Sequence, residues 1–188
     1  MGKLLLTTIL LIFLSVVSLC HAQQTDLVID EKPAPKLINP IQTHLRVYWH
    51  ENFTGPNPTS VVIAEAPSTN SSATQFGRTY TFDNPLTLDP VSTVDVVGRA
   101  QGLYAFTSKE EMAFTLTLNV LFTEEKYNGS TILVYGRVNV DNTVKEIPIV
   151  GGSGVFKYAT GYSSVQRTSF DPATFNNVIK YDLFVNHY

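Results

Sequence analysis

The stretch Phe114-Thr-Leu-Thr-Leu-Asn-Val-Leu-Phe122 carries the clearest structural pattern in this chain of 188 residues. Every second side chain from Phe114 to Phe122 is apolar, and the polar residues Thr115, Thr117 and Asn119 lie between them. Successive side chains of a β-strand point to opposite faces, so a period of two predicts a strand with one buried face. We therefore expect this segment to form one wall of a β-structure around an apolar core.

The same period of two recurs along most of the chain. Strands are accordingly expected around Thr43–Glu51, Ser60–Glu65, Arg78–Asp83, Ser92–Thr107, Ile132–Val140, Val144–Val150, Val155–Thr168 and Ile179–Val185. Turn-forming sequences such as Asp83-Asn-Pro85 and Asn128-Gly129 separate them. About eight strands with short connections predict an all-β fold, an eight-stranded closed antiparallel β-barrel, because closure removes unpaired edges. A β-sandwich is the alternative, since periodicity does not distinguish the two.

The chain divides into three parts by composition. Residues 1–22 pair a lysine, Lys3, with an apolar run from Leu4 to Leu19 and end at small residues, which predicts a secretory signal peptide cleaved after Ala22. Residues 23–39 are polar with spaced prolines and are expected to form a flexible N-terminal arm, followed by one barrel domain over residues 40–188. The single cysteine, Cys20, would leave with the signal peptide, so the exported domain is expected to depend on its core alone.

The charge pattern argues against some classes of partner. The formal net charge is −3, and the basic residues are scattered singly. Nucleic acids and anionic membrane surfaces attract clustered basic residues, so we expect neither as a partner. Asn52, Asn70 and Asn128 each begin an N-glycosylation triplet, which predicts an exported glycoprotein.

Motifs for metals, cofactors and nucleophilic catalysis are not evident. His44 and His50 share a strand face but are too far apart to bind one ion together, and no cysteine supplements them or His187. The run Gly151-Gly-Ser-Gly154 lacks the glycine two residues after the serine that a nucleophile elbow requires. No helix is expected after it, as a phosphate-binding glycine loop would need. We therefore expect no metal and no cofactor.

Glu51 is the leading candidate for proton-transfer chemistry. In the expected first strand, Glu51 has the same parity as Trp49, so a straight strand would point both into the apolar interior. Burial disfavours the ionised form of a carboxyl group, which would make Glu51 a proton donor or acceptor. The alternative is that the strand ends at His50 and Glu51 is solvated.

Other candidate site residues are cationic or aromatic. Arg99 lies in the middle of an expected strand, where it could form an ion pair or hold a phenolate, and Lys145 shares parity with apolar neighbours. A pocket for flat aromatic rings is expected from the aromatic residues. The candidates for substrate contact are Trp49, Arg99, Tyr104, Phe106 and Phe175.

Short motifs follow one another in order from about His44 to Tyr188. They are Tyr48-Trp-His-Glu51, Asn57-Pro-Thr59, Arg99-Ala-Gln-Gly102, Lys126-Tyr-Asn-Gly-Ser130, Gly136-Arg137, Val150-Gly-Gly-Ser-Gly154 and Ala159-Thr-Gly-Tyr162. Together they resemble the signature of plant dirigent proteins. The resemblance implies an eight-stranded antiparallel barrel of the allene-oxide-cyclase type, assembled as a homodimer or homotrimer and located in the apoplast.

The resemblance also implies a function in phenylpropanoid and lignan biosynthesis. Dirigent proteins bind phenoxy radicals made by a separate laccase or peroxidase and set the face on which the radicals couple, with no oxidative activity of their own. Glu51 falls on a family aspartate that exchanges a proton with a quinone-methide oxygen, which makes it, with Lys145, a candidate catalytic residue. Tyr104 and Phe106 fall where pocket aromatics of the family lie.

Some positions depart from the lignan-forming members. Val138 stands where those members carry an aspartate, Lys145 replaces an arginine, and the exported chain lacks their cysteine pair. These differences place the chain nearer to the branch that includes pterocarpan synthases. The alternative function is therefore a hydro-lyase that removes water from an isoflavanol through a bound quinone methide. A carrier barrel of lipocalin type or a structural cell-wall role are further alternatives.

Overall fold

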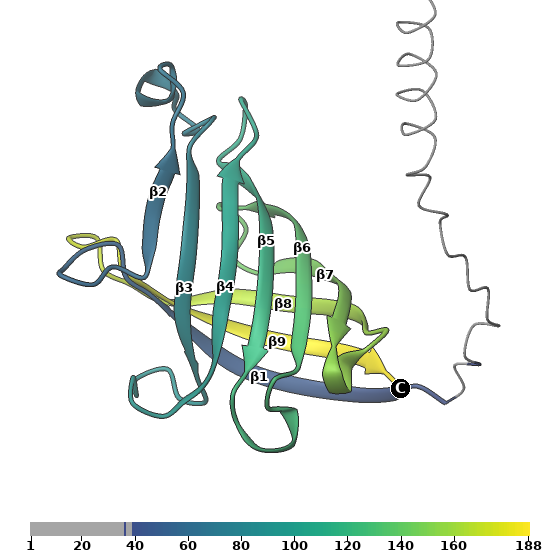
Figure 1. Ribbon diagram of the computed structural model, residues 1–188. Helices are drawn as coiled ribbons and strands as arrows, with labels where there is room; N and C mark the ends of the chain where they lie inside the picture. Colours follow the sequence, from purple (N-terminus) through teal and green to yellow (C-terminus); the bar gives the residue numbers. More distant parts are fainter. Residues whose placement is uncertain (1–35, 37–38) are drawn as a thin grey trace, which may run out of the picture. The chain divides into compact units, whose positions relative to one another are not determined.

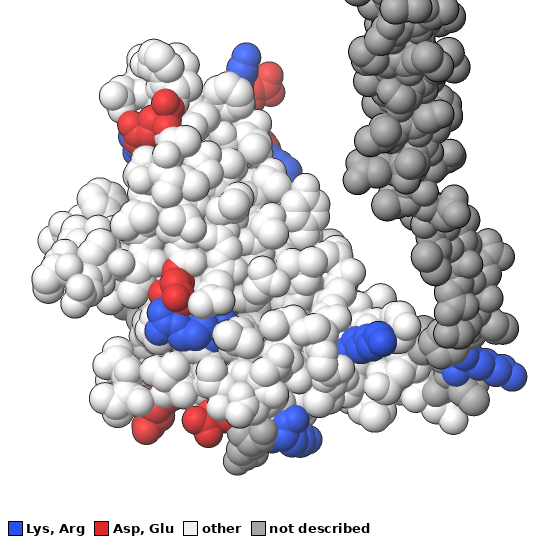
Figure 2. All heavy atoms as spheres, viewed as in Figure 1, with Lys and Arg blue, Asp and Glu red and all other residues white. Residues whose placement is uncertain are grey.

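The computed structural model describes Lys36 and residues 39–188. The predicted signal peptide 1–22, and the predicted arm 23–39 apart from Lys36 and Asn39, lie outside the described residues. None of the helices in the described part is long and apolar enough to cross a membrane. On the face drawn in Figure 2, basic and acidic side chains lie in small separate groups.

Nine strands and three short 3-10 helices make up the described part of the chain. The strands are β1 (Ile41–Glu51), β2 (Ser60–Ala64), β3 (Thr79–Thr87), β4 (Val96–Phe106), β5 (Ala113–Phe122), β6 (Thr131–Asn139), β7 (Lys145–Ser153), β8 (Thr160–Phe170) and β9 (Asn177–His187). The 3-10 helices are η1 (Thr69–Ser71), η2 (Glu125–Tyr127) and η3 (Gly154–Phe156).

Eight of the strands close into an antiparallel barrel (Figure 1). The order of neighbours is β1-β9-β8-β7-β6-β5-β4-β3, and a further pairing of β1 with β3 completes the circle. That closing contact is short, because it joins only Tyr48 to Thr87 and Trp49 to Leu86. The ninth strand, β2, pairs instead with the first half of β3, from Thr79 to Phe82. The closed barrel predicted from the sequence is confirmed, and the sandwich alternative is wrong.

One predicted turn is part of a strand. The sequence Asp83-Asn-Pro85 predicts a turn, but β3 continues through it and pairs with β4 on one side. On its other side, β3 pairs with β2 up to Phe82 and with β1 only from Leu86, so Pro85 lies where that side has no continuous ladder. A proline, which lacks a backbone donor, is tolerated at such an interruption.

Glycines allow the strands of the barrel wall to lie close together. A Cβ atom at Gly102 in β4 would lie 2.0 Å from the backbone oxygen of Thr117 in β5 and 3.0 Å from the Phe82 ring. No side chain fits at such a distance, so glycine is required for β4 to pack at this point. Gly102 pairs with Leu118, and the inner face of the wall on which both lie is filled by buried apolar side chains such as Leu116 and Leu118.

One end of the barrel is closed by aromatic side chains. Phe156 of η3 is fully buried, and its ring centroid lies 5.4 Å from that of Phe122, 5.1 Å from that of Tyr127 and 5.1 Å from that of His187. His187 is held in turn by contacts with Thr43 Oγ1 at 2.9 Å and the Val155 carbonyl at 3.1 Å. This plug lies where β5 and β9 finish.

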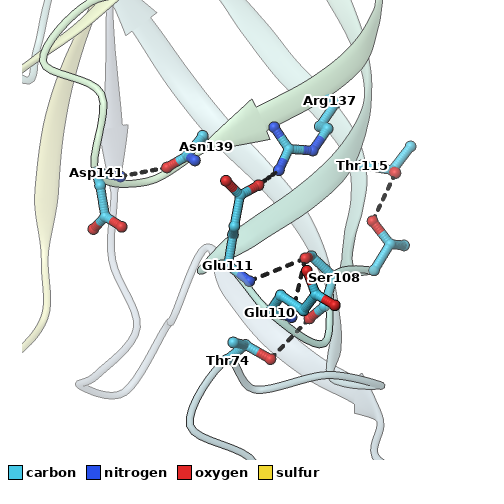
Figure 3. A network of polar contacts seen from close by, with 9 residues as sticks. Thr74, Ser108, Glu110, Glu111, Thr115, Arg137, Asn139 and Asp141 are labelled. Carbon is cyan, nitrogen blue, oxygen red and sulfur yellow. Dashed lines mark hydrogen bonds and ion pairs between the residues drawn. The ribbon is translucent and has the colours of Figure 1, made fainter.

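The loops at the opposite end are joined by polar contacts (Figure 3). Arg137 of β6 pairs with Glu111 in the loop between β4 and β5. The backbone N–H of Glu111 donates to Ser108 Oγ at 3.1 Å, and Thr74 Oγ1 donates to the Ser108 carbonyl at 2.8 Å. These contacts fix the β4–β5 loop against its neighbours on the side of the barrel where β1, β4, β6 and β8 end.

Candidate functional site

A cavity of about 160 Å³ lies inside the barrel at the end opposite the aromatic plug. This volume is well above the roughly 10–15 Å³ that one water molecule occupies, so the interior is not filled by its own side chains. Aliphatic side chains of β5 to β9 form one part of the wall. The aromatic lining residues are Trp49, Phe53, Tyr104, Phe114 and Tyr181. The polar lining residues are Glu51, Lys145, Arg167 and Asn177.

Glu51 is the last residue of β1 and lies on the cavity wall. The structure places it on the same face as Trp49, which agrees with the parity of the strand, and only 4% of the residue is exposed. Ser60 Oγ donates to Glu51 Oε1 at 2.8 Å, and Asn177 Nδ2 donates to Oε2 at 3.3 Å. Burial raises the pKa of Glu51 to about 7, although both hydrogen bonds act in the opposite direction. The carboxyl can therefore both give and take a proton near neutral pH.

Ser60 and Asn84 extend this hydrogen-bond network. Ser60 is the first residue of β2 and is 1% exposed, and Asn84 of β3 is completely buried. Asn84 Nδ2 donates to Ser60 Oγ at 3.3 Å, while Ser60 donates to Glu51. Strand β2, which lies outside the barrel circle, thus supplies one of the two groups that hold the carboxylate. Sequence reasoning missed both residues, because a serine and an asparagine carry no signal of their own.

Aromatic rings surround the carboxyl group. The Trp49 ring centroid lies 5.6 Å from that of Tyr181 in a stacked arrangement, and the Tyr104 ring centroid lies 4.9 Å from that of Phe114. Burial, together with the charge of Glu51, raises the pKa of both tyrosines, so their phenols stay neutral. Among the described residues, the buried indole N–H of Trp49 and the side-chain oxygen of Asn177 have no hydrogen-bond partner. A ligand with polar groups could satisfy both.

Two cations line the cavity on adjacent strands. Lys145 begins β7 and pairs in register with Val165 of β8, and Arg167 follows two residues later on the same face of β8. Burial and the neighbouring charge of Arg167 lower the pKa of Lys145, while Asp141 acts in the opposite direction. Lys145 was predicted from the sequence as a site residue. Arg167 was not, because its position depends on the register between β7 and β8.

Three predicted site residues do not line the cavity. Arg99 faces the outside of the barrel, where its Nε donates to Asp83 Oδ1 at 2.7 Å, so its predicted substrate contact is replaced by an external ion pair. Phe106 is buried in the core on the face of β4 that carries Tyr104, with its ring centroid 5.6 Å from that of Phe114, but it does not line the cavity. Phe175 is 62% exposed, in the loop before β9. Its carbonyl accepts from Asn177 Nδ2 at 3.0 Å, so it supports the site only through that contact.

The histidines have partners of a structural kind. His44 contacts Asp182 at 2.8 Å, His50 contacts Thr87 at 2.8 Å, and His187 belongs to the aromatic plug. Across the described ranges, no group of three or more metal-ligating side chains gathers. The three glycosylation candidates, Asn52, Asn70 and Asn128, are all exposed.

Comparisons with known proteins agree with this geometry. Residues 42–186 match the family model described as "Dirigent-like protein". The chain is 41% identical over 147 residues to pterocarpan synthase 1 of Glycine max, covering 78% of this chain and 79% of that protein. It is 47% identical over 129 residues to dirigent protein 8 of Arabidopsis thaliana, covering 69% and 73% of the two chains.

Solved structures give the same assignment. A pterocarpan synthase dirigent protein superimposes with a TM-score of 0.74 at 36% sequence identity, over 81% of this chain and 88% of that chain. The chain therefore belongs to the dirigent family, as its ordered motifs predicted.

Proposed function

We propose that this protein binds a phenolic intermediate in the barrel cavity and controls the stereochemistry of its reaction. The observation that carries the proposal is one buried carboxyl group, Glu51, on the wall of a cavity lined by aromatic rings. Flat apolar walls suit phenylpropanoid rings, and a group whose pKa is about 7 can exchange a proton with a phenolic or quinone oxygen.

In the leading form of the proposal, the protein is a stereo-directing auxiliary for radical coupling. A separate laccase or peroxidase removes one electron and one proton from each phenol, and each radical contributes one electron to the new carbon–carbon bond. The coupled product is a quinone methide. When a hydroxyl group attacks its methide carbon, protonated Glu51 gives a proton to the quinone oxygen and the hydroxyl proton returns to the carboxylate.

Coupling of coniferyl alcohol by a laccase, with and without the protein, tests this form. The expected result is an excess of one product enantiomer on chiral chromatography, and Glu51→Gln should reduce that excess. Glu146→Gln, which changes an exposed carboxyl group of β7, is the matched control. An enantiomer ratio that the wild-type protein leaves unchanged for several phenols would refute the auxiliary role.

A hydro-lyase is the second candidate, and the similarity to pterocarpan synthases favours it. In this reaction protonated Glu51 would donate its proton to the leaving hydroxyl of an isoflavanol, and the substrate phenol would release its own proton to solvent, which gives the quinone methide and water. Turnover of an isoflavanol without any oxidant distinguishes this activity from the auxiliary role. A Glu51→Gln variant that keeps the full rate would remove Glu51 from the mechanism.

The setting of the function is part of the proposal. The predicted signal peptide and the exposed glycosylation candidates support export to the apoplast, where laccases and peroxidases would supply the radicals. A homodimer or homotrimer is proposed for the assembly. Ultracentrifugation of the exported protein tests that assembly, and a monomer at all concentrations would contradict it.

A further inference from the structure

The charged groups that line the cavity differ in how deeply they are buried. Glu51 is 4% exposed and is enclosed by Ser60 and Asn177, whereas Lys145 is half-buried and Arg167 is exposed. The carboxyl group therefore lies deep, and the two cations lie towards the solvent. Among the described residues, no other charged side chain lines the cavity.

The two cations are close neighbours of like charge. Because Lys145 is in register with Val165, Arg167 occupies the diagonal position across the β7–β8 pair. Diagonal side chains on one face of such a pair have Cα atoms about 7–8 Å apart, which long side chains bridge easily. The lowering of the Lys145 pKa by Arg167 is consistent with this proximity.

Neither cation is neutralised by the protein itself. The ion pairs of the described residues include neither Lys145 nor Arg167. Lys145 donates to the Asn142 carbonyl, and Arg167 lies 4.7 Å above the Phe170 ring. Neither contact supplies a negative charge, and the exposed carboxylate of Asp141 acts on Lys145 without forming an ion pair with it. By contrast, Arg99 and Arg137 on the outside of the barrel each pair with a carboxylate.

We propose that Lys145 and Arg167 form an anion-binding rim that selects phenols whose side chain ends in a carboxylate. This inference rests on the proposed function, because the same cavity binds the aromatic ring. The phenolic end enters towards Glu51, and the carboxylate at the other end of the molecule lies between the two cations. Guanidinium and ammonium groups are the usual partners of carboxylates in proteins.

The state of Glu51 contributes to this selectivity. With a pKa of about 7, Glu51 is mostly protonated in mildly acidic solution, so it adds no negative charge that would repel an anionic ligand. Under the same conditions an ordinary carboxyl group, with a pKa of about 4, is ionised. The cavity then carries net positive charge and the ligand carries net negative charge.

Calorimetric titration with two matched ligands tests the proposal. Ferulic acid and coniferyl alcohol share one ring and differ at the end of the side chain, where one has a carboxylate and the other a hydroxymethyl group. At about pH 6, we expect ferulate to bind about tenfold more tightly, which corresponds to about 1.4 kcal/mol. Methyl ferulate, which is uncharged, should bind as coniferyl alcohol does.

Paired variants connect the preference to the rim. In Lys145→Gln/Arg167→Gln, the preference for ferulate over coniferyl alcohol should fall to about twofold or less, because the loss of affinity is greater for the anionic ligand. The control Lys109→Gln/Lys157→Gln removes two exposed cations that lie outside the cavity, each stacked on an aromatic ring, and should keep the preference. In the wild-type protein, the preference should also shrink when salt rises from about 20 mM to about 500 mM, because ions screen exposed charges.

The outcomes separate this inference from the proposed function. If ferulate and coniferyl alcohol bind equally well, the anion-binding rim is refuted and the phenol-binding cavity stands. If a preference exists but survives in the rim variant at full size, the assignment to Lys145 and Arg167 is wrong. If neither ligand binds, the proposed function of the cavity fails together with the inference.

Discussion

The protonation of Glu51 makes a prediction about stability that needs no substrate. Burial raises the pKa of this carboxyl group from its ordinary value of 4.5 to about 7 in the folded protein. A group with a raised pKa binds its proton more tightly in the folded state than in the unfolded state. Below pH 4.5 the carboxyl is protonated in both states and costs nothing. Between pH 4.5 and about 7, the unfolded chain releases this proton while the folded protein keeps it. The folded state therefore loses stability relative to the unfolded state as the pH rises through this range.

The magnitude follows from the two pKa values. Each pH unit between them is worth about 1.4 kcal/mol, so the folded state loses about 3 kcal/mol between pH 4.5 and pH 7. Above pH 7 the loss is complete and constant. In a chain of this size, 3 kcal/mol corresponds to roughly 6–12 °C in Tm.

The perturbation is Glu51→Gln, which removes the titrating group and keeps the size of the side chain. The free energy of unfolding of wild type and variant is measured by urea titration at several pH values between about 4 and 8.5. From the acid to the alkaline end of this range, the free energy of unfolding of the variant should increase by about 3 kcal/mol relative to that of wild type. The amide introduced by the substitution also contacts Asn177 Nδ2, so the free energies of unfolding of variant and wild type are expected to differ by an amount that does not depend on pH. Only the change of this difference with pH is interpreted.

The exposed residue Glu146 supplies the control, because Glu146→Gln should leave the pH dependence unchanged. A difference between wild type and Glu51→Gln that stays constant from acid to alkaline pH would show that Glu51 titrates normally. Burial would then not prepare this carboxyl group for proton exchange near neutral pH.

Three further predictions concern the support of the site, the barrel wall and the surface. Ser60→Ala removes a hydrogen bond that lowers the pKa of Glu51, so carbon-13 NMR should show its titration at higher pH than in wild type; an unchanged midpoint would contradict the role of Ser60. Gly102→Ala places a methyl group against the backbone of Thr117 and should destabilise the fold by about 1–3 kcal/mol in urea unfolding. Gly151→Ala, where a Cβ meets no atom within 4 Å, should cost much less, and equal losses would count against the packing argument. Enzymatic removal of N-glycans from the protein secreted by plant cells should lower its mass, and no change in mass would mean that none of the three asparagines is modified. The asparagines are Asn52, Asn70 and Asn128.

Much of the fold could be predicted from local sequence. Alternation of apolar and polar residues located the strands, since the side-chain period of a strand is a property of the backbone itself. The prediction failed at Asp83-Asn-Pro85, where a turn-forming sequence forms part of β3. Pro85 is accommodated there because two different strands share that side of β3, an arrangement that no local pattern reveals.

Some residues of the candidate site could likewise be predicted from the sequence, and others could not. Parity on one strand was enough to place Glu51 beside Trp49, and an apolar neighbourhood was enough to point to Lys145. Arg99 was misplaced because a charged residue in a strand has no preferred face until its partner is known, and that partner, Asp83, lies on the next strand.

The sequence by itself determined the period of each strand and the parity of Glu51, because both depend on neighbours along the chain. Only the tertiary structure decided which groups surround that carboxyl. Asn177 is 126 positions away from Glu51 along the chain, and Arg167 meets Lys145 through the pairing of β7 with β8. Such contacts depend on strand register and on barrel closure, which are set by packing of the whole core, so no single segment of the chain encodes them.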